Sequence, residues 1–264
     1  MHIKSRNAAT SITNRYIYMH NGSILSANQH DWLHAEASSL PMVGWLAQPL
    51  FVAELAGDDV YLQVLCSSAI SALGAHHGRE MMAILPSAQA DLLARALQLS
   101  HWLRDHQHCG RCGKPTQLHK SDYGMHCSTC LHTQYPRLSP CIIVVITGPK
   151  GMLLAHNTRF PEGRFSALAG FVEAGETIEA AVHREVWEEV GIEIQDLEYV
   201  GSQSWSFPHS LMMGFMATYT AGEIAVDGIE IDEADWFTPD CLPDLPPKFS
   251  IARQLVDMGL ARVG

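Results

Sequence analysis

Hydrophobic residues gather in short stretches along the first part of the chain. Apolar stretches at 15–18, 50–55 and 60–66 are separated by turn signals such as Asn21-Gly22. Stretches of this length between turn residues are typical of strands. After Pro86, apolar residues recur at helical spacing as far as Leu103, and Ser87 is the expected N-cap. The pattern therefore predicts a small β-rich domain followed by a long helix.

The second half of the chain mixes strand and helix patterns. A β-branched run at 141–146, a glycine-proline turn and an apolar stretch at 152–156 predict a second sheet that begins with a hairpin. A loop rich in glycine and charge at 159–175 precedes a predicted helix at 177–190, which Gly191 ends. Further elements are expected as strands near 192–200 and 211–220 and as a last helix near 250–258.

Composition places the chain among ordinary globular proteins. Of its 264 residues, 47% are hydrophobic and 17% are charged, which is too apolar for a disordered chain and predicts about two domains. The stretch from Met1 to Asn21 has no apolar run of signal-peptide length, and no later run reaches the roughly 18 apolar residues of a membrane span. We therefore expect a cytoplasmic protein with no membrane partner.

The charge is divided unevenly between the two halves. Residues 1–141 carry a net charge of +1, whereas residues 142–264 carry −12. Because like charges repel, an acidic half is suited to a polyphosphate only if divalent cations lie between them.

Four of the seven cysteines form two C-x-x-C pairs, Cys109/Cys112 and Cys127/Cys130. Four thiolates from two tight turns favour one structural Zn²⁺ per chain in a closed tetrahedral site. The alternatives are an iron–sulfur site or four reduced thiols without metal. The remaining cysteines are expected to be small buried hydrophobic residues: Cys66, Cys141 and Cys241.

A zinc ribbon is often a nucleic-acid module, so a binding protein without catalysis is a rival hypothesis. The ribbon carries Arg111, Lys114 and Lys120 against Asp122, which is only a weak basic bias. Nonspecific nucleic-acid binding usually requires a basic patch.

The predicted helix at 177–190 carries three glutamates, Glu185, Glu188 and Glu189, on one patch beside an apolar stripe. Carboxylates at these spacings repel one another, and divalent cations reverse the sign of that interaction. Mg²⁺ or Mn²⁺ held there would keep open positions for water and phosphate oxygens, which suits hydrolysis of a phosphoanhydride. The alternative is a solvated acidic helix face.

Residues 170–192 resemble the Nudix box, G-x5-E-x7-R-E-U-x-E-E-x-G-U, at every specified position. The resemblance implies an α+β Nudix fold, an α-β-α sandwich. It also implies metal ligation by Glu185 and Glu189, with Glu188 contributing to the metal cluster or to proton transfer. Arg184 resembles the structural arginine of the box, with Glu176 as its partner. The further metal ligands that the resemblance implies are the carbonyl of Ala169 and the carboxylate of Glu230.

Residues 202–210 are similar to the S-Q-P-W-P-F-P-x-S motif of the NADH pyrophosphatase family. In this motif Trp205 and Phe207 could stack on planar bases, while Gln203 and Ser210 could hydrogen-bond a nucleotide; the alternative is an aromatic pair that packs at a strand edge. Two serines replace prolines of the motif, which removes two fixed φ angles. The substrate contacts that the resemblance implies are Asp122, Tyr135, Gln203, Ser204, Trp205, Ser206, Phe207, Pro208, His209, Ser210 and Ala252.

The order of these motifs also resembles the family's domain organisation. It implies a β-rich α/β amino-terminal domain at 1–105, a four-cysteine zinc ribbon at 106–138 and a catalytic Nudix domain at 139–264. The implied function is metal-dependent hydrolysis of NAD(H) to AMP and nicotinamide mononucleotide, removal of NAD caps from RNA 5′ ends, and assembly as a homodimer. The alternative within the superfamily is hydrolysis of ADP-ribose or another nucleoside diphosphate derivative.

Overall fold

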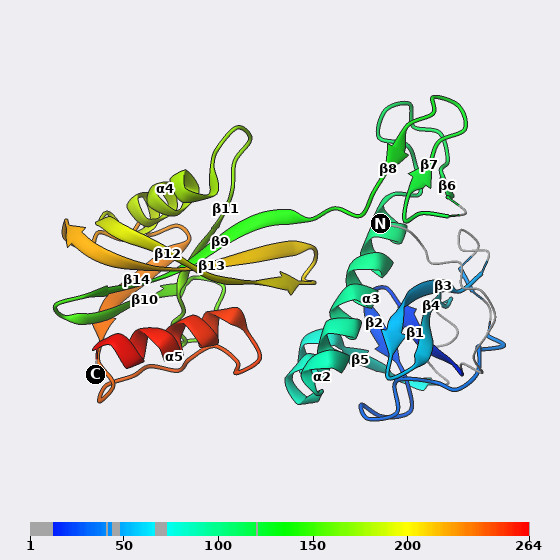
Figure 1. Ribbon diagram of the computed structural model, residues 1–264, viewed down its shortest axis with the longest axis horizontal. Coiled ribbons are helices and arrows are strands. Elements are labelled where there is room, and N and C mark those ends of the chain that lie inside the picture. The colour runs from blue at the N-terminus through cyan, green and yellow to red at the C-terminus, as the bar shows by residue number, and fades with distance from the viewer. Residues whose placement is uncertain (1–12, 41, 44–47, 67–72, 120, 264) are drawn as a thin grey trace. The chain divides into compact units, whose positions relative to one another are not determined.

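The computed structural model describes residues 13–40, 42–43, 48–66, 73–119 and 121–263 (Figure 1). The chain forms two compact units, one up to Arg137 together with Ser206–His209, the other Leu138–Trp205 together with Ser210–Gly264. Two sequence-based expectations lie partly outside the described residues. The stretch without a signal-peptide pattern includes residues 1–12, and the weak basic bias of the ribbon includes Lys120. No helix of the described part has the length and apolarity to cross a membrane.

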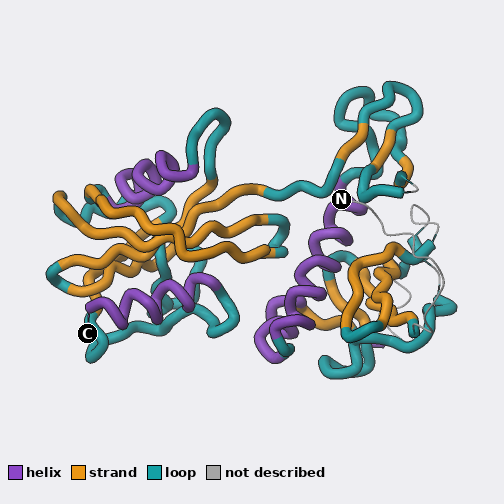
Figure 2. Tube along the Cα trace, in the orientation of Figure 1, coloured by secondary structure: helices purple, strands orange, loops and turns teal. Residues whose placement is uncertain are grey.

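The first unit contains a five-stranded sheet in the order β3-β4-β1-β2-β5. Its strands are β1 (Asn14–His20), β2 (Ser23–Leu25), β3 (Leu50–Leu55), β4 (Asp58–Val64) and β5 (Ala75–His77). The three predicted strands correspond to β1, β3 and β4. Helix α2 (Gly78–Ile84) follows β5, and the long helix α3 (Ser87–Asp105) packs against β3 and β4 (Figure 2).

The predicted cap of helix α3 is wrong by one residue. Ser87 is the first helical residue, and Pro86 is the N-cap, with φ −57° and ψ 148° and no side-chain capping bond. Proline fixes φ near this value and has no N–H to leave unpaired, so the helix can begin directly after it.

The zinc ribbon completes the first unit with three short antiparallel strands, β6 (Gln117–Leu118), β7 (Met125–His126) and β8 (Thr133–Gln134). Tyr123, only 1% exposed, donates its hydroxyl hydrogen to the carbonyl oxygen of Phe51 in β3 at 2.7 Å. This bond ties the ribbon to the amino-terminal sheet, so the two parts pack as one unit.

The second unit is built on a six-stranded mixed sheet in the order β12-β13-β9-β10-β14, with β11 pairing with β9. The strands β9 and β13 are parallel, and the other pairs are antiparallel. The elements are β9 (Ser139–Gly148), β10 (Gly151–Asn157), β11 (Leu168–Phe171), α4 (Ile178–Val190), β12 (Glu193–Trp205), β13 (Ser210–Ala221), β14 (Ile231–Phe237) and α5 (Ile251–Val263).

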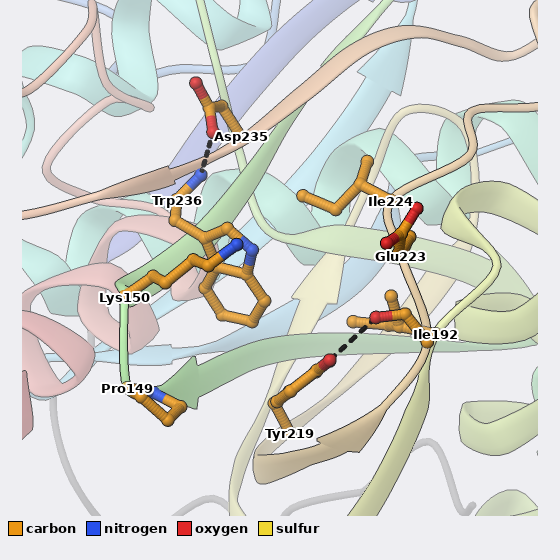
Figure 3. Close-up of a pocket in the computed structure, with 9 residues that line it drawn as sticks. Pro149, Lys150, Ile192, Tyr219, Glu223, Ile224, Asp235 and Trp236 are labelled. Carbon is orange, nitrogen blue, oxygen red and sulfur yellow. Dashed lines mark hydrogen bonds between the residues drawn. The ribbon is translucent and has the colours of Figure 1, made fainter.

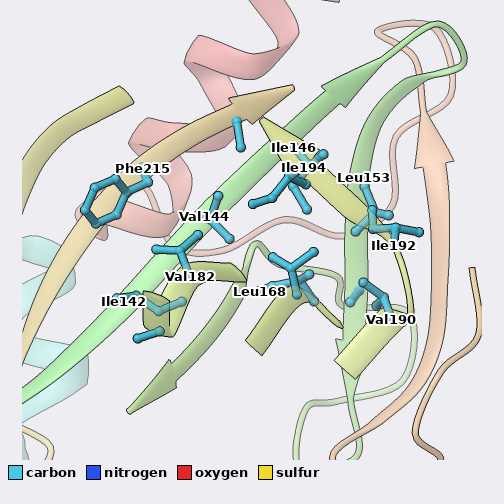
Figure 4. Close-up of a cluster of buried hydrophobic side chains, with 14 of the residues drawn as sticks. Ile142, Val144, Ile146, Leu153, Leu168, Val182, Val190, Ile192, Ile194 and Phe215 are labelled. Carbon is cyan, nitrogen blue, oxygen red and sulfur yellow. The ribbon is translucent and has the colours of Figure 1, made fainter. Parts of the chain in front are cut away.

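Helices α4 and α5 cover opposite faces of this sheet (Figure 1). On one face, Val182 of α4 lies near Ile142 and Val144 of β9, and Val190 belongs to the same buried cluster (Figure 4). On the other face, Leu255 of α5 packs with a second set of strand residues. The α-β-α sandwich expected from the sequence is confirmed.

Two strands of this sheet lie where the sequence predicted none. The segment 159–175 was expected to be a loop, but β11 forms within it and pairs with β9. In β11 the glycine at position 170 weakens the strand pattern, because glycine is depleted in strands. Strand β14 is rich in Asp and Glu and also lacks a clear apolar pattern.

Candidate active site and metal centres

The four cysteines of the ribbon converge on one point. Their Sγ atoms all lie within 4.8 Å of one another, with 3.5 Å between Cys109 and Cys130 and 3.6 Å between Cys112 and Cys127. The backbone N–H of Cys130 is the main cause that lowers the pKa of the Cys127 thiol to about 6. A tetrahedral set of four sulfurs, of which one ionises readily, fits Zn²⁺. Among the described residues these cysteines form the one such group, without a histidine.

The three remaining cysteines differ in exposure. Cys141 is buried as predicted, and burial raises the pKa of its thiol to about 12. Cys66 is half-buried. For Cys241 the prediction of burial is wrong, because the residue lies exposed in a turn that its backbone N–H closes onto the carbonyl of Thr238 at 3.0 Å.

Helix α4 holds the three predicted catalytic glutamates in a fixed frame. The Thr177 hydroxyl accepts the backbone N–H of Ala180 at 3.2 Å, and Gly191, at φ +69°, ends the helix in the left-handed region. The sequence predicted the end at Gly191, and it placed the start of the helix at Thr177, which the structure shows to be the N-cap before Ile178. Val182 and Val186 are fully buried, so the helix cannot rotate without exposing its apolar stripe.

Arg184 is the centre of an ion-pair network around these glutamates. Its Nε and Nη2 donate to the two carboxylate oxygens of Glu176 at 2.8 and 2.9 Å, which is the pairing that the Nudix resemblance implies. Its Nη1 donates to both Glu185 and Glu188 at 2.9 Å, and Nη2 also reaches the carbonyl of Phe171 in β11 at 2.9 Å. The fork of this guanidinium therefore fixes helix, strand and carboxylates together.

Glu185 packs directly over strand β11. Its side chain is 14% exposed, and a Cβ built on Gly170 would lie 1.8 Å from its carboxylate carbon. Only glycine leaves room for this carboxylate. The contact brings Glu185 beside the strand residue that precedes Gly170, Ala169, whose carbonyl is a predicted metal ligand.

Glu189 is the least neutralised carboxylate of the cluster. It is 6% exposed, and its Oε2 is buried with no hydrogen-bond partner. Burial, followed by the charges of Glu185, Glu230 and Asp227, raises the pKa of Glu189 to about 8. The structure thus brings the predicted ligand Glu230 close to Glu189, although 41 positions separate them in the sequence.

Asp227 is a residue of this cluster that the sequence reasoning missed. Its carboxylate accepts the backbone N–H groups of Ile229, Glu230 and Ile231 at 3.2, 3.1 and 2.9 Å. It therefore shapes the loop that presents Glu230. The Asp227-Gly228 dipeptide, a turn signal just before Glu230, was the clue in the sequence.

The cluster fits divalent cations. A buried carboxylate oxygen without a partner, surrounded by like charges, is costly unless a cation neutralises it. Glu188 differs from the other two helix glutamates in exposure, because its side chain is 56% exposed, although Glu188 and Glu185 both pair with Arg184. The oxygen-rich set of Glu185, Glu189 and Glu230 suits a hard divalent cation.

A family model described as the NUDIX domain matches residues 137–257, and one described as the NADH pyrophosphatase zinc ribbon domain matches residues 104–135. A protein named NAD-capped RNA hydrolase NudC, from Pseudomonas aeruginosa (strain LESB58), is 42% identical over 238 residues, covering 88% of this chain and 82% of that protein. The chain belongs to the Nudix hydrolase family. A protein of the same name from Pasteurella multocida (strain Pm70) is 48% identical over 176 residues, covering 66% of this chain and 67% of that protein.

In this Nudix hydrolase the predicted substrate motif at 202–210 is divided between the two units. In the second unit, the Gln203 side chain donates to the carbonyl of Phe249 at 2.9 Å and accepts the backbone N–H of Ile251 at 2.8 Å. Trp205 stacks on Phe249 with ring centres 5.9 Å apart. Gln203 therefore fixes the start of α5, where the predicted substrate contact Ala252 lies.

The segment Ser206–His209 belongs to the first unit. Phe207 lies 6.3 Å from the ring of His77, in a stacked arrangement, and the Arg79 guanidinium lies 4.7 Å from the Phe207 ring centre. Ser206 is fully buried, with its hydroxyl 4.0 Å from the sulfur of Met82. The rest of the motif lies on the flanking strands and their turn: Ser204, Pro208, His209 and Ser210.

The ribbon of the Nudix hydrolase carries the other two predicted substrate residues. Tyr135 is 57% exposed, and its ring lies near Gly124. Asp122 has a buried carboxylate oxygen with no hydrogen-bond partner. An exposed tyrosine and an unpaired buried oxygen are both compatible with a ligand contact.

The second unit also contains a separate cavity of about 420 Å³ at the β9–β10 turn (Figure 3). Tyr219 and Trp236 meet there edge to face, with ring centres 5.3 Å apart, and the Tyr219 hydroxyl donates to the carbonyl of Gly222 at 2.6 Å. The residues that line it include none of the Nudix glutamates: Pro149, Lys150, Ile192, Tyr219, Gly222, Glu223, Ile224, Asp235 and Trp236.

Proposed function

We propose that this Nudix hydrolase cleaves the pyrophosphate of NAD(H) into AMP and nicotinamide mononucleotide, and that it removes NAD caps from RNA 5′ ends. The observation that carries the chemistry is the buried, unpaired carboxylate oxygen of Glu189 within a cluster of like charges. The substrate is supported by the relatives named NAD-capped RNA hydrolase and by the motif at 202–210.

Mg²⁺ or Mn²⁺ would be held by the carboxylates of Glu185, Glu189 and Glu230 and by the carbonyl of Ala169. When bound, such an ion withdraws charge from phosphoryl oxygens and lowers the pKa of the attacking water. The chain's own residues set the geometry. Arg184 orients Glu185 and Glu188 through its Nη1 atom, so their carboxylates are positioned before substrate arrives.

A carboxylate of the helix accepts the proton of the attacking water, and the three glutamates differ in their suitability. Glu189 is buried, and its pKa of about 8 applies without metal; a divalent cation bound to Glu189 would lower that pKa and occupy its carboxylate. Glu188 is exposed and shares a guanidinium with Glu185, so it can exchange a proton with solvent. A proton acceptor works best when its pKa lies near the working pH.

The substrate contacts are proposed from the motif and the ribbon. The motif assigns the two bases to Trp205 and Phe207, whose rings already stack on Phe249 and His77, and it assigns polar contacts to Ser204, Ser206 and Ser210. Gln203 serves as a positioning residue, because both ends of its amide already bind the backbone beside Ala252. Further proposed contacts of the segment and the ribbon are Pro208, His209, Tyr135 and Asp122.

We further propose that the enzyme is a cytoplasmic homodimer with one Zn²⁺ per chain and the three-part organisation 1–105, 106–138 and 139–264. The zinc site is supported by the four converging Sγ atoms. The dimer follows from the likeness to the NADH pyrophosphatase family. Sedimentation of the purified protein tests the dimer, and a single species of monomer mass would contradict it.

Product analysis tests the function directly. The purified protein is incubated with NADH, ADP-ribose or NAD-capped RNA, each with Mg²⁺ or Mn²⁺, and the products are separated. We expect AMP and reduced nicotinamide mononucleotide from NADH, and 5′-monophosphate RNA from the capped RNA. Preferential cleavage of ADP-ribose would favour another Nudix activity. Retention of RNA without any AMP release would favour a non-catalytic ribbon protein.

A further inference from the structure

The first unit holds a polar cavity of about 230 Å³ between the end of α3 and the zinc ribbon. Four histidines contribute to its wall: His101 and His106 from the end of α3, His108 from the following turn, and His209. Arg137, at the end of the ribbon, also lines it. None of these residues belongs to the glutamate cluster, and only His209 lies in the motif at 202–210.

Three buried polar atoms around this cavity have no hydrogen-bond partner. They are the indole Nε1 of Trp102, the Nδ1 of His101 and the side-chain oxygen Oε1 of Gln134. Trp102 is only 3% exposed, so its N–H has no access to bulk water. Buried polar groups in folded proteins are nearly always paired, and each unpaired one costs free energy. All three atoms belong to residues that line one cavity, where a ligand could supply the acceptor and the donor that they lack.

The charges of the cavity favour an anion. Its one carboxylate, Asp105, is held by Arg104, whose Nε donates to it at 2.8 Å. Arg137 has no ion pair with any residue that the structure describes. The histidines do not converge as metal ligands within the described part of the chain. A positively charged guanidinium and an indole N–H remain, and both are donors suited to phosphate oxygens.

We propose that this cavity binds the phosphate group of a nucleotide. In this assignment Arg137 and the Trp102 N–H donate to the phosphate, and the Gln134 oxygen accepts a hydrogen from a ribose hydroxyl. The nucleotide is either a free mononucleotide or a segment of an RNA chain, because both carry the same phosphate and ribose groups. The site does not depend on hydrolysis at the glutamate cluster.

Binding measurements on the full, zinc-loaded chain test the proposal. AMP, inorganic phosphate and a short 5′-phosphorylated oligoribonucleotide are titrated by calorimetry without added Mg²⁺ or Mn²⁺, so that the acidic glutamate cluster repels each anion. Arg137→Gln and Trp102→Phe remove one donor each. Loss of a hydrogen bond to a charged group predicts roughly tenfold weaker binding in either variant. Two matched controls, Arg111→Gln and Trp32→Phe, are expected to bind as the parent protein does.

The three ligands separate the sources of the phosphate. Tighter binding of AMP than of the oligoribonucleotide supports a mononucleotide site, and the reverse order supports an RNA site. The proposal is overturned if no ligand binds, if Arg137→Gln binds as tightly as the parent, or if the cavity takes up Ni²⁺ and excludes phosphate. Trp102 is buried, so Trp102→Phe could fail to fold. Arg137 is the last residue of the main segment of the first unit, and Arg137→Gln is therefore expected to fold and to decide the result on its own.

Discussion

The two metal clusters of this chain are built on opposite principles. In the ribbon, four soft sulfur atoms lie within 4.8 Å of one another and complete a tetrahedral set by themselves. In the Nudix domain, hard carboxylates face one another, and Arg184 neutralises Glu185 and Glu188 but leaves an oxygen of Glu189 unpaired. A closed set leaves no position for substrate, whereas an incomplete one does. The first cluster therefore suits a structural role, and the second suits the reaction that we propose.

The largest expected effect is the loss of the sulfur cluster. Cys127→Ser removes a thiolate, and a structural Zn²⁺ of this type contributes on the order of 10 kcal/mol of apparent binding free energy. We expect zinc content to fall from one ion per chain to none, with a clearly lower melting temperature. Elemental analysis and thermal unfolding measure both. Cys241→Ser, at the exposed cysteine, should retain full zinc; equal loss in both variants would contradict the assignment.

The second-largest expected effect concerns the glutamate cluster of the Nudix domain. Glu189→Gln keeps the shape of the side chain but removes the charge that a divalent cation needs. We expect turnover of NADH to fall by about 10²–10⁴-fold, with zinc content and fold unchanged. Steady-state kinetics with the zinc assay check this. Glu179→Gln, on the exposed first turn of the same helix, is the matched control. Unchanged turnover in Glu189→Gln would exclude this cluster as the reaction centre.

The third expected effect is that the glutamate cluster makes the stability of the protein depend on pH. The pKa of Glu189 is about 8 in the folded protein against 4.5 for a free glutamate, so the folded state holds an extra proton between these values. Without divalent metal, this contribution is fully present below pH 4.5 and is lost as the pH rises through 8. The expected loss is about 2–4 kcal/mol.

Urea denaturation over a pH series measures that loss. Glu189→Gln should flatten the slope of unfolding free energy against pH, because its amide does not titrate in this range. Glu193→Gln, at an exposed position of β12, should keep the slope of the parent protein. If the slope survives in Glu189→Gln, another group is responsible for it.

The smallest expected effect comes from the arginine network. Arg184→Lys keeps the positive charge but cannot reproduce five bonds to Glu176, Glu185, Glu188 and Phe171. We expect about 10–100-fold weaker activation by Mg²⁺, as for other groups that orient metal ligands. Metal titrations of NADH turnover check this. Arg262→Lys, in an exposed pair with Glu198, is expected to change little.

The functional helix was predictable because local chemistry specifies it. Thr177 caps its start, Gly191 ends it, and the stripe through Val182 and Val186 gives its buried face. The two cysteine pairs were also predictable from the sequence, because the members of each pair lie within one turn of each other along the chain. The fold class was implied by the resemblance of residues 170–192 to the Nudix box.

Contacts between distant segments account for most of what the sequence did not reveal. Asp227 joins the cluster only because its loop folds back to Glu189, and Gln203 binds backbone 46 positions away at Phe249. The strands β11 and β14 form by pairing with neighbours and have little apolar periodicity of their own. No local pattern in the sequence encodes such pairings.

Gly170 sets how closely helix α4 can pack against strand β11, which matters for redesign of this enzyme. Since even a methyl group there would overlap the carboxylate carbon of Glu185, the distance between strand and helix is set by a single hydrogen atom. A library that varies position 170 should therefore yield folded proteins whose helix has been pushed outward. In such proteins the Glu185 carboxylate would no longer lie against β11, and we expect activity to be lost before the fold is.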